Sequence, residues 1–260
     1  MKQNDKAKAV KQAYIKKNNI WYEDALFRTK LVCKMIGSDN KFQRILDGAG
    51  FFPTAHVLAD HYPQAKVTMV NLFEDDILYD FYNNIEHVKG DVTKLAFPDN
   101  HFDMAFFGEL FEHVYDLPGL MAEITRVLKP GGILALSTPN LAAWYNRILL
   151  LFGKCPINYH PTPIFYNSAL QEQCRREYNN SKQREFPLHH FHIRVFTPDR
   201  LIDYLKIKDF VIENHTVCNL STPDRRFFLI RKLIGYLLTQ NAKEDIIIIA
   251  RNEKNKEDTI

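Results

Sequence analysis

The sequence has little cysteine and no long apolar run. The 260-residue chain holds four cysteines, Cys33, Cys155, Cys174 and Cys218, without the CxxC spacing of a metal or redox motif. We therefore expect reduced thiols, as in a cytoplasmic protein. No apolar run approaches the roughly 20 residues that a membrane span needs. The composition thus predicts at most a peripheral contact with a membrane.

The chain also lacks an excess of charge of either sign. Its formal net charge is +3, and the basic residues are spread along the sequence, which does not favour a nucleic-acid-binding surface. The first 18 residues are rich in Lys and Asn and have no apolar core, so they do not resemble a secretory signal. We expect a cytoplasmic location. A hydrophobic share of 46% is typical of a globular protein with a real core.

Strands and helices alternate between residue 44 and about residue 140. The hydrophobic periodicity predicts strands at 43–47, 66–73, 86–92, 102–109 and 133–140, and helices at 20–36, 54–63, 74–84 and 117–132. This alternation predicts an α/β fold with a doubly wound, mostly parallel sheet and right-handed crossovers. Ligands of such sheets bind beyond the carboxyl ends of the strands, so the informative residues are those that follow each strand.

The alternation stops after residue 140. Residues 141–190 begin with an amphipathic helix and continue as a Pro-, Tyr- and Asn-rich stretch, which predicts an inserted lid or substrate segment. A helix is predicted at 197–207, with Thr197 as its N-cap and Pro198 at its first position. Strands at 209–217 and 244–252 are expected to form an antiparallel pair at the sheet edge. We predict a single domain over 1–260, with 1–40 as a helical N-terminal segment.

Residues 89–139 carry the most specific pattern. They read KGDVTKLAFPDNHFDMAFFGELFEHVYDLPGLMAEITRVLKPGGILALSTP. The GD, FD, EH and LKPGG pieces, in this order, resemble the class I S-adenosylmethionine-dependent methyltransferases of the bacterial small-molecule, lipid or glycan type. The resemblance covers about residues 40–140 and, in part, 192–213. It implies a seven-stranded Rossmann-like sheet, S-adenosyl-L-methionine as cofactor, and methyl transfer to an oxygen or nitrogen of a small molecule, lipid or glycan intermediate.

The stretch RILDGAGFFP places a glycine-bearing turn after the first predicted strand. Glycines allow close backbone approach to a ligand and positive φ angles. Gly48 and Gly50 match two glycines of the family's acidic-x-Gly-x-Gly-x-Gly pattern, whereas Phe52 occupies the third position. Asp47 stands one residue late for the acidic position. The resemblance implies that Asp47, Gly48 and Gly50 receive the methionine end of the cofactor.

The ends of the next three strands supply the other cofactor residues that the resemblance implies. Asp91 and Val92 would lie at the adenine, although Asp91 also fits a plain turn residue after glycine. Gly108 and Glu109 would lie along the methionine part. Asn71 stands where the family usually has an acid for the ribose hydroxyls. An amide still hydrogen-bonds a hydroxyl, but without charge assistance, at a loss of about 1 kcal/mol.

Two histidines are candidate general bases. His113, in EHVYD, lies in the segment that the family places near methyl group and substrate, and an unperturbed imidazole pKa suits proton transfer at neutral pH. The alternative is a packed histidine at a helix start. His190 belongs to HHFH, with His189 and His192, and either acts as a base or packs in a loop. We expect no metal there, because the sequence near HHFH offers neither a cysteine nor a carboxylate pair.

Several alternatives stay open at this point. The insertion carries aromatic residues that predict a lid over the acceptor, a satellite core or a homodimer contact. These residues are Trp144, Tyr145, Tyr159, Phe165 and Tyr166. The departures at Phe52 and Asn71 are also compatible with a non-catalytic methyltransferase-like scaffold or regulatory module. A nicotinamide-dependent oxidoreductase is disfavoured, since the chain has no GxGxxG turn and no acid after the second strand.

Overall fold

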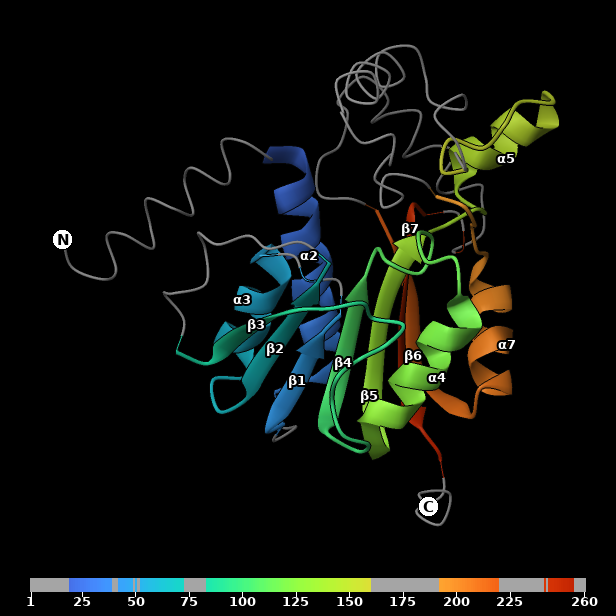
Figure 1. The fold of residues 1–260 in the computed structure, drawn as a ribbon. Coiled ribbons are helices and arrows are strands. Elements are labelled where there is room, and N and C mark those ends of the chain that lie inside the picture. Colours follow the sequence, from blue (N-terminus) through green and yellow to red (C-terminus); the bar gives the residue numbers. More distant parts are fainter. Residues whose placement is uncertain are drawn as a thin grey trace, which may run out of the picture.

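A seven-stranded sheet with the strand order β3-β2-β1-β4-β5-β7-β6 forms the centre of the molecule (Figure 1). The computed structural model describes residues 19–38, 42–48, 50, 52–72, 83–159, 192–219, 241 and 243–254. The strands are β1 (Arg44–Asp47), β2 (Lys66–Asn71), β3 (Ile85–Lys89), β4 (Phe102–Gly108), β5 (Leu128–Pro139), β6 (Phe210–Cys218) and β7 (Asp245–Asn252).

Strands β3, β2, β1, β4 and β5 run parallel to one another. β7 runs antiparallel to β5 and to β6, so that β6 forms the edge. The predicted mostly parallel sheet with an antiparallel pair at one edge is confirmed. Residues 246–250 of β7 are all buried, as expected for a strand covered on both faces.

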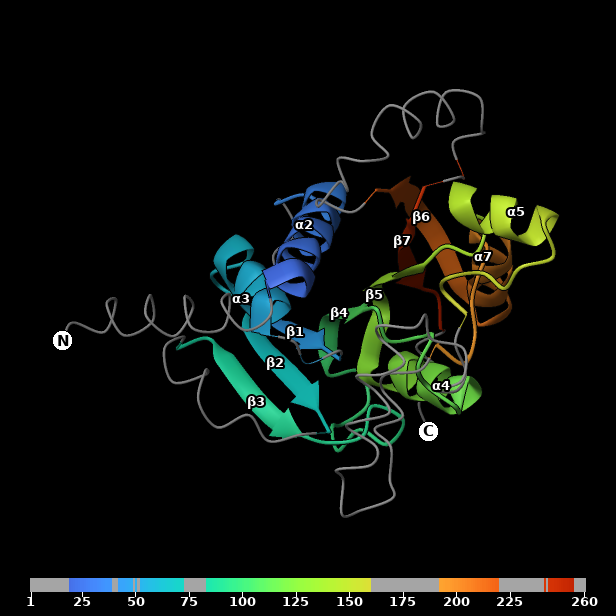
Figure 2. The ribbon, with the colours of Figure 1, turned by 90° about the horizontal axis from the view of Figure 1, so that it is seen from above.

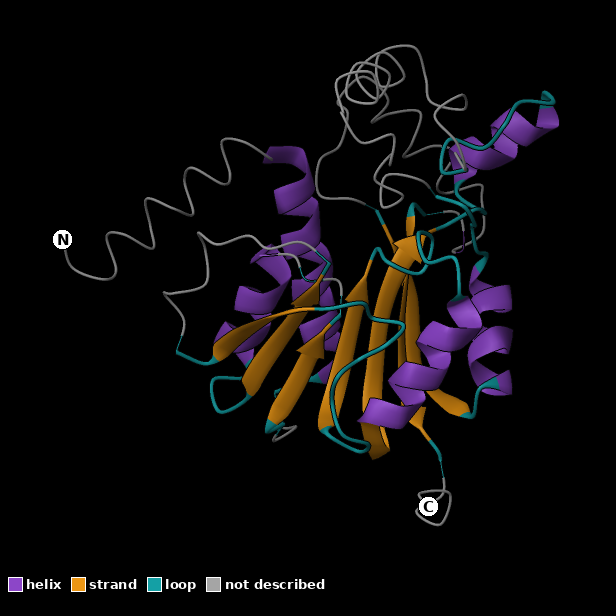
Figure 3. Ribbon diagram, in the orientation of Figure 1, coloured by secondary structure: helices purple, strands orange, loops and turns teal. Residues whose placement is uncertain are grey.

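Helices cover both faces of the sheet (Figures 2 and 3). Helices α2 and α3 pack on one face, and α4 and α7 pack on the other. Their bounds are α2 (Asn19–Ile36), α3 (Phe52–His61), α4 (Leu117–Val127) and α7 (Pro198–Ile207). Neighbouring residues Ile45 and Leu46 of β1 belong to the two different cores, because successive strand side chains point to opposite faces. The doubly wound prediction therefore holds.

The predicted helix at 117–132 is too long at its C-terminal end. Helix α4 ends at Val127, and Leu128 is already extended and pairs with Phe102 of β4. Pro130 explains the early end, since a residue before proline is disfavoured in the helical region and Lys129 therefore leaves the helix. The glycines Gly131 and Gly132 lie within β5 rather than at the helix stop. At the other end, Asp116 caps α4 by accepting a hydrogen bond from Gly119 N at 2.9 Å.

Helices α7 and α5 (Trp144–Leu151) lie where the sequence predicts helices, but the N-terminal cap of α7 differs from the prediction. Helix α7 begins at Pro198 as predicted, but the Thr197 hydroxyl donates to the Asp199 carboxylate and caps no backbone N–H. Helix α5 matches the amphipathic start of the insertion and lies beyond the carboxyl ends of the strands (Figure 1). None of the helices in the described ranges is long and apolar enough for a membrane span. The predicted helix at 74–84 and most of the insertion lie outside these ranges.

Candidate functional site

The predicted cofactor residues come from separate motifs and lie at one edge of the sheet. Asp47, Asn71 and Gly108 are the last residues of β1, β2 and β4, and Asp91 follows β3. These strands are parallel neighbours, so their carboxyl ends meet at the same edge (Figure 1). Parallel pairing thus brings together residues that are up to about 60 positions apart, at the place where ligands of doubly wound sheets bind.

The glycine turn after β1 is held between its two neighbouring strands. Gly48 N donates to Phe106 O at 2.9 Å, and Asn71 Nδ2 donates to Gly50 O at 3.1 Å. Gly50 has a φ of +53°, and a Cβ there would lie 2.3 Å from Val70 O. No other residue type fits this backbone without a shift. The turn therefore presents its backbone at the sheet edge in a fixed conformation.

Asp47 holds this turn from within the protein. Its carboxylate is fully buried and accepts a hydrogen bond from the Thr54 hydroxyl in the first turn of α3. The bond joins the end of β1 to the start of the helix that follows. This arrangement favours a positioning role for Asp47, and its direct contact with the cofactor stays a prediction. Phe52 is the first residue of α3, and its side chain lies outside the described part of the structure.

Asp91 shapes the turn after β3. Its Oδ1 accepts hydrogen bonds from the backbone N and the hydroxyl of Thr93, both at 2.8 Å. Gly90 N donates to Asn71 O at 2.9 Å, which places this turn beside the end of β2. The carboxylate is exposed, and an ionised carboxylate has about four acceptor positions, so the turn does not exhaust them. Val92 is half-buried against the core.

Glu109 belongs to a buried ionic cluster that sequence reasoning missed. Arg28 of α2 donates from Nη1 to Asp245 Oδ2 at 3.0 Å, and its Nε lies 3.7 Å from Glu109 Oε1. The Ser137 hydroxyl donates to the same Glu109 oxygen at 2.8 Å. Arg28 and Asp245 are 7% and 3% exposed, so the cluster lies in the protein interior beneath the sheet edge. The sequence feature that could have indicated this cluster is Arg28, a charged residue on the apolar face of the predicted helix 20–36.

One guanidinium serves two carboxylates in this cluster. Burial opposes the charge of Arg28, but the nearby Glu109 and Asp245 outweigh it and raise the arginine pKa, so Arg28 stays protonated. Burial and the charge of Glu109 raise the pKa of Asp245, while Arg28 opposes that rise. The sheet edge at β4 and β7 therefore carries a surplus of acidic groups over cationic ones among the described residues of the cluster.

A second group lies just beyond β4. Glu112 is fully buried, its Oε2 accepts a hydrogen bond from the Thr138 hydroxyl at 2.9 Å, and its Oε1 lies 3.7 Å from His113 Nε2. Burial, together with the charge of Glu109, raises the pKa of Glu112 well above its usual range. His113 is half-buried, and its backbone N donates to Leu110 O in the turn. Its predicted role as a base stays a prediction.

His192 joins Glu112 and His113 from the far end of the insertion. The rings of His113 and His192 have centroids 4.7 Å apart, and His192 Nδ1 lies 3.0 Å from Asn158 O. Glu112, His113 and His192 each offer one ligand atom within 4.8 Å of the others. The prediction of no metal considered only sequence neighbours of HHFH, and the fold supplies partners about 80 positions away. His189 and His190 lie outside the described residues.

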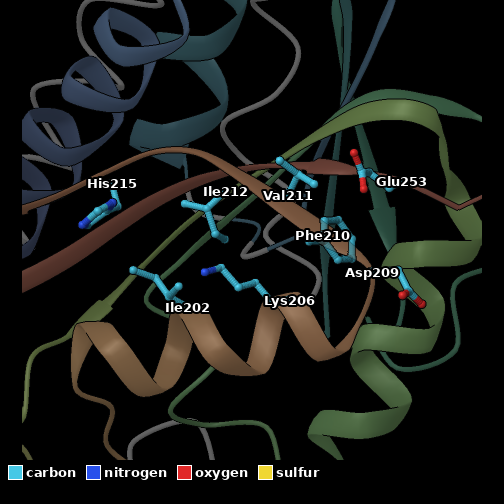
Figure 4. A pocket seen from close by; sticks show the side chains of 8 residues that line it. All are labelled: Ile202, Lys206, Asp209, Phe210, Val211, Ile212, His215 and Glu253. Carbon is cyan, nitrogen blue, oxygen red and sulfur yellow. The ribbon is translucent and has the colours of Figure 1, made fainter.

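A groove of about 530 Å³ lies elsewhere, between α7 and β6 (Figure 4). It is lined by Ile202 and Lys206 of the helix and by Phe210 and His215 of the strand, among others. Phe210 pairs with Asn252, whereas Cys218 pairs with Asp245, so the groove lies toward the amino ends of the parallel strands. It is therefore separate from the edge where the predicted cofactor residues meet.

Comparison with known proteins assigns the core of the chain. Residues 48–136 match the family model of a methyltransferase domain. This region contains the glycine turn, the ends of β2 to β4, and helix α4. Over these residues the chain is similar to a methyltransferase domain. The predicted family and cofactor are thereby supported for this domain.

Curated relatives share shorter stretches of sequence. A sterol 24-C-methyltransferase of Gibberella zeae is 49% identical over 51 residues, which are 20% of this chain and 13% of the relative. A demethylmenaquinone methyltransferase of Listeria welshimeri is 37% identical over 82 residues, which are 28% of this chain and 35% of the relative. The alignment with these relatives thus spans about a third of their length or less.

Solved structures share the fold over most of the chain. An S-adenosylmethionine-dependent methyltransferase of Aquifex aeolicus has a TM-score of 0.54 at 14% identity and covers 92% of this chain and 97% of its own. The 1,6-didemethyltoxoflavin-N1-methyltransferase of Burkholderia thailandensis, with 1,6-didemethyltoxoflavin and S-adenosylhomocysteine bound, has a TM-score of 0.54 at 15% identity. The match covers 95% of this chain and 87% of that chain. These likenesses establish the Rossmann-like methyltransferase fold.

The residues of the domain edge fit the cofactor chemically. S-adenosylmethionine has an adenine amino group, ribose hydroxyls and a cationic methionine end. The edge offers carboxylates at Asp91 and Glu109, an amide at Asn71 and the backbone of the glycine turn. Carboxylates and amides accept hydrogen bonds from amino groups and hydroxyls, and acidic groups attract the cationic end. The groups at this edge are therefore chemically compatible with S-adenosylmethionine.

Proposed function

We propose that this protein transfers a methyl group from S-adenosylmethionine to an oxygen or nitrogen of a small molecule, lipid or glycan intermediate. The observation that carries the proposal is the meeting of Gly50, Asn71, Asp91 and Glu109 at one sheet edge within a methyltransferase domain. The bound cofactor supplies an electrophilic methyl group on a sulfonium. The protein then has to position the acceptor and to remove its proton.

The acidic surplus around Arg28 suits a cationic ligand. Glu109 and Asp245 share one guanidinium. In a low-dielectric interior such a surplus favours a positive charge at the adjoining edge. It supports a cofactor that carries a sulfonium and an ammonium group over a neutral or anionic one. We assign Glu109 to the orientation of that methionine end.

The surroundings of the acceptor support an apolar substrate. Helix α5 lies beyond the carboxyl ends of the strands (Figure 1). This helix and the turn after it expose large apolar side chains. These are Leu150 (53% exposed), Leu151 (80%), Phe152 (73%) and Ile157 (63%). The sterol and menaquinone relatives carry lipid-like acceptors in their names, and the sterol enzyme's name adds carbon to the acceptor atoms worth testing. We infer an apolar, ring-bearing or lipid-like acceptor.

His113 is the candidate base for the acceptor proton. It is half-buried in the turn after β4, on the same connection as Glu109 and next to Glu112. An imidazole can accept a proton near neutral pH. His190 stays a second candidate, and it lies outside the described residues.

The proposal is tested by methyl transfer from labelled S-adenosylmethionine. Purified protein is incubated with aqueous and lipid fractions of a bacterial extract, and the labelled product is sought by chromatography and mass spectrometry. We expect label in an apolar fraction, and at least about tenfold less with Glu109→Gln, because the charge that orients the cationic end is lost. Glu213→Gln, on the edge strand β6, is the matched control and retains activity.

A non-catalytic scaffold is the second candidate, and the same assay separates the two. Its motivation is the use of Asn71 as a brace for the glycine turn, which leaves the ribose without the usual acid. Cofactor binding without labelled product from any fraction would favour the scaffold. Product formation that depends on Glu109 rules it out.

A further inference from the structure

Glu112, His113 and His192 form a compact group that we name the Glu–His cluster. Their ligand atoms lie within 4.8 Å of one another. Glu112 and His113 follow β4, whereas His192 comes at the end of the insertion, and Ile193 N donates to Glu112 O at 2.9 Å. This backbone bond holds the two segments together. The cluster is therefore part of the fold and does not depend on chance contacts of long surface side chains.

The carboxylate of the cluster is placed as a ligand would be. Glu112 is fully buried, and Thr138 satisfies Oε2, while Oε1 accepts no hydrogen bond from any described residue. A buried carboxylate oxygen in this state is costly unless a cation neutralises it. Oε1 lies 3.7 Å from His113 Nε2. Two ligands about 2.0–2.2 Å from one tetrahedral ion are about 3.4 Å apart, close to this separation.

His192 has the hydrogen bond that orients many metal-binding histidines. Its Nδ1 lies 3.0 Å from the carbonyl oxygen of Asn158. A carbonyl only accepts, so Nδ1 carries the proton and Nε2 keeps its lone pair. Such a bond to a backbone carbonyl fixes both tautomer and ring orientation and raises the basicity of the ligating nitrogen. His192 is thereby prepared to bind through Nε2.

We propose that the Glu–His cluster binds a divalent first-row transition-metal ion, Zn²⁺ foremost, through Glu112 Oε1, His113 Nε2 and His192 Nε2. Two imidazoles and one carboxylate suit this class of ion better than Mg²⁺ or Ca²⁺. Three protein ligands leave a fourth position for water or an oxygen of the acceptor. The inference goes beyond methyl transfer, since the ion binds whether or not the cofactor does. In the metal-bound protein His113 is a ligand, so its proposed role as general base applies only to the metal-free protein.

The test is direct metal binding by the full-length protein. The chain is stripped with a chelator, dialysed and titrated with ZnCl₂ by calorimetry. Co²⁺ serves as a second probe, because tetrahedral coordination gives it a visible absorption. The variants are Glu112→Gln, which keeps the shape and the Thr138 bond, and His192→Gln in a half-buried segment. The matched control is His215→Gln, an exposed histidine of β6 away from the cluster. Far-ultraviolet circular dichroism checks that each variant is folded.

We expect one equivalent of Zn²⁺ in the parent chain and in His215→Gln, with affinity reduced at least about 100-fold in both cluster variants. The Co²⁺ spectrum should disappear in those two variants. Failure of the parent chain to bind one equivalent overturns the proposal and leaves Glu112 and His113 as an ion pair. Unchanged affinity in either folded cluster variant overturns it as well, since the ion then binds elsewhere. Both outcomes are independent of methyl transfer, which is measured separately.

Discussion

At the scale of single residues, Asn71 departs from the acid that the methyltransferase resemblance implies. The structure gives the amide a use of its own, since Nδ2 donates to Gly50 O at 3.1 Å and so braces the glycine turn. A carboxylate has no proton to donate at neutral pH and would face that carbonyl with a negative charge. The hydrogen bond to Gly50 explains why an amide fits at this strand end. An acid could accept hydrogen bonds from the ribose hydroxyls but could not donate to the turn.

Replacing Asn71 by the acid that the family usually has should therefore lower the affinity for the cofactor. We expect Asn71→Asp to lower affinity for S-adenosylmethionine about five- to thirtyfold, because the lost brace, on the order of 2–3 kcal/mol, exceeds the gain of about 1 kcal/mol at the ribose. Isothermal titration measures it. Leu72→Ala, at the exposed neighbouring position, is the control and keeps the parent affinity. A tighter Asn71→Asp variant would show that the brace is unimportant.

Gly50 allows the cost of positive φ to be separated from the cost of a clash. Its φ is +53° and an added Cβ meets Val70 O at 2.3 Å, whereas Gly131 has a φ of +76° with nothing within 4 Å. We expect Gly131→Ala to lose about 1–2 kcal/mol of unfolding free energy through φ alone. Gly50→Ala should lose more and also bind the cofactor at least about tenfold more weakly. Urea unfolding and calorimetric titration measure the two effects, and equal losses in both would contradict the clash.

At the scale of elements, Arg28 joins α2 to the ends of β4 and β7 through Glu109 and Asp245. We expect Arg28→Met to lower the free energy of unfolding by about 3–5 kcal/mol, because two buried carboxylates lose their countercharge. Lys66→Met, which breaks the exposed pair with Glu86, is the control and should cost less than about 1 kcal/mol. Denaturant unfolding at neutral pH compares the free energies of unfolding of the two variants. A similarly small loss in both would contradict the buried ion cluster and indicate that Arg28 is solvated.

Asp103 joins three strands at the opposite edge. Its Oδ2 accepts from the backbone N of Gln43 and Arg44, each at 2.8 Å, and its Oδ1 accepts from Lys129 Nζ. Burial opposes ionisation, but these bonds prevail and lower the pKa of Asp103 below its usual value. A lowered pKa in the folded state contributes stability above the unfolded value of about 3.9, and that stability is lost as pH falls through the folded pKa.

This linkage predicts a pH-dependent difference between the parent chain and Asp103→Asn. At pH 7 we expect the variant to be about 1–3 kcal/mol less stable, since the charged bond to Lys129 and the backbone bonds are weakened. The difference should shrink as the pH is lowered from about 4 through the folded pKa. Urea unfolding at a series of pH values measures it. A difference that stays constant down to pH 2 would show that the Asp103 charge is not responsible.

Element boundaries show which sequence signals were sufficient. The alternation of apolar strands and amphipathic helices is a local pattern, so it predicted the parallel strands, the order of helices and the start of α7. The end of α4 was wrong because a glycine pair outweighed Pro130 in the prediction, whereas the proline sets the boundary. The buried cluster around Arg28 and the Glu–His cluster depend on contacts across about 80–217 positions, which no local pattern encodes.

At the scale of the whole molecule, the site is a product of strand order. The order β3-β2-β1-β4 brings the ends of four strands to one edge, and the same order places Asn71 beside both the glycine turn and Asp91. The sequence could predict this edge because parallel sheets place strand ends together. The sequence could not predict which of the side chains at this edge hydrogen-bond to the backbone and which face a ligand.

Calorimetric titration of the full chain with S-adenosylmethionine and S-adenosylhomocysteine tests whether this edge is a working S-adenosylmethionine site. We expect one site with micromolar affinity for both ligands, a ΔG of binding of about −8 kcal/mol, and much weaker binding in Gly50→Ala but not in Gly131→Ala. Absence of binding at millimolar concentration of either ligand, in protein that is folded by circular dichroism, would contradict it.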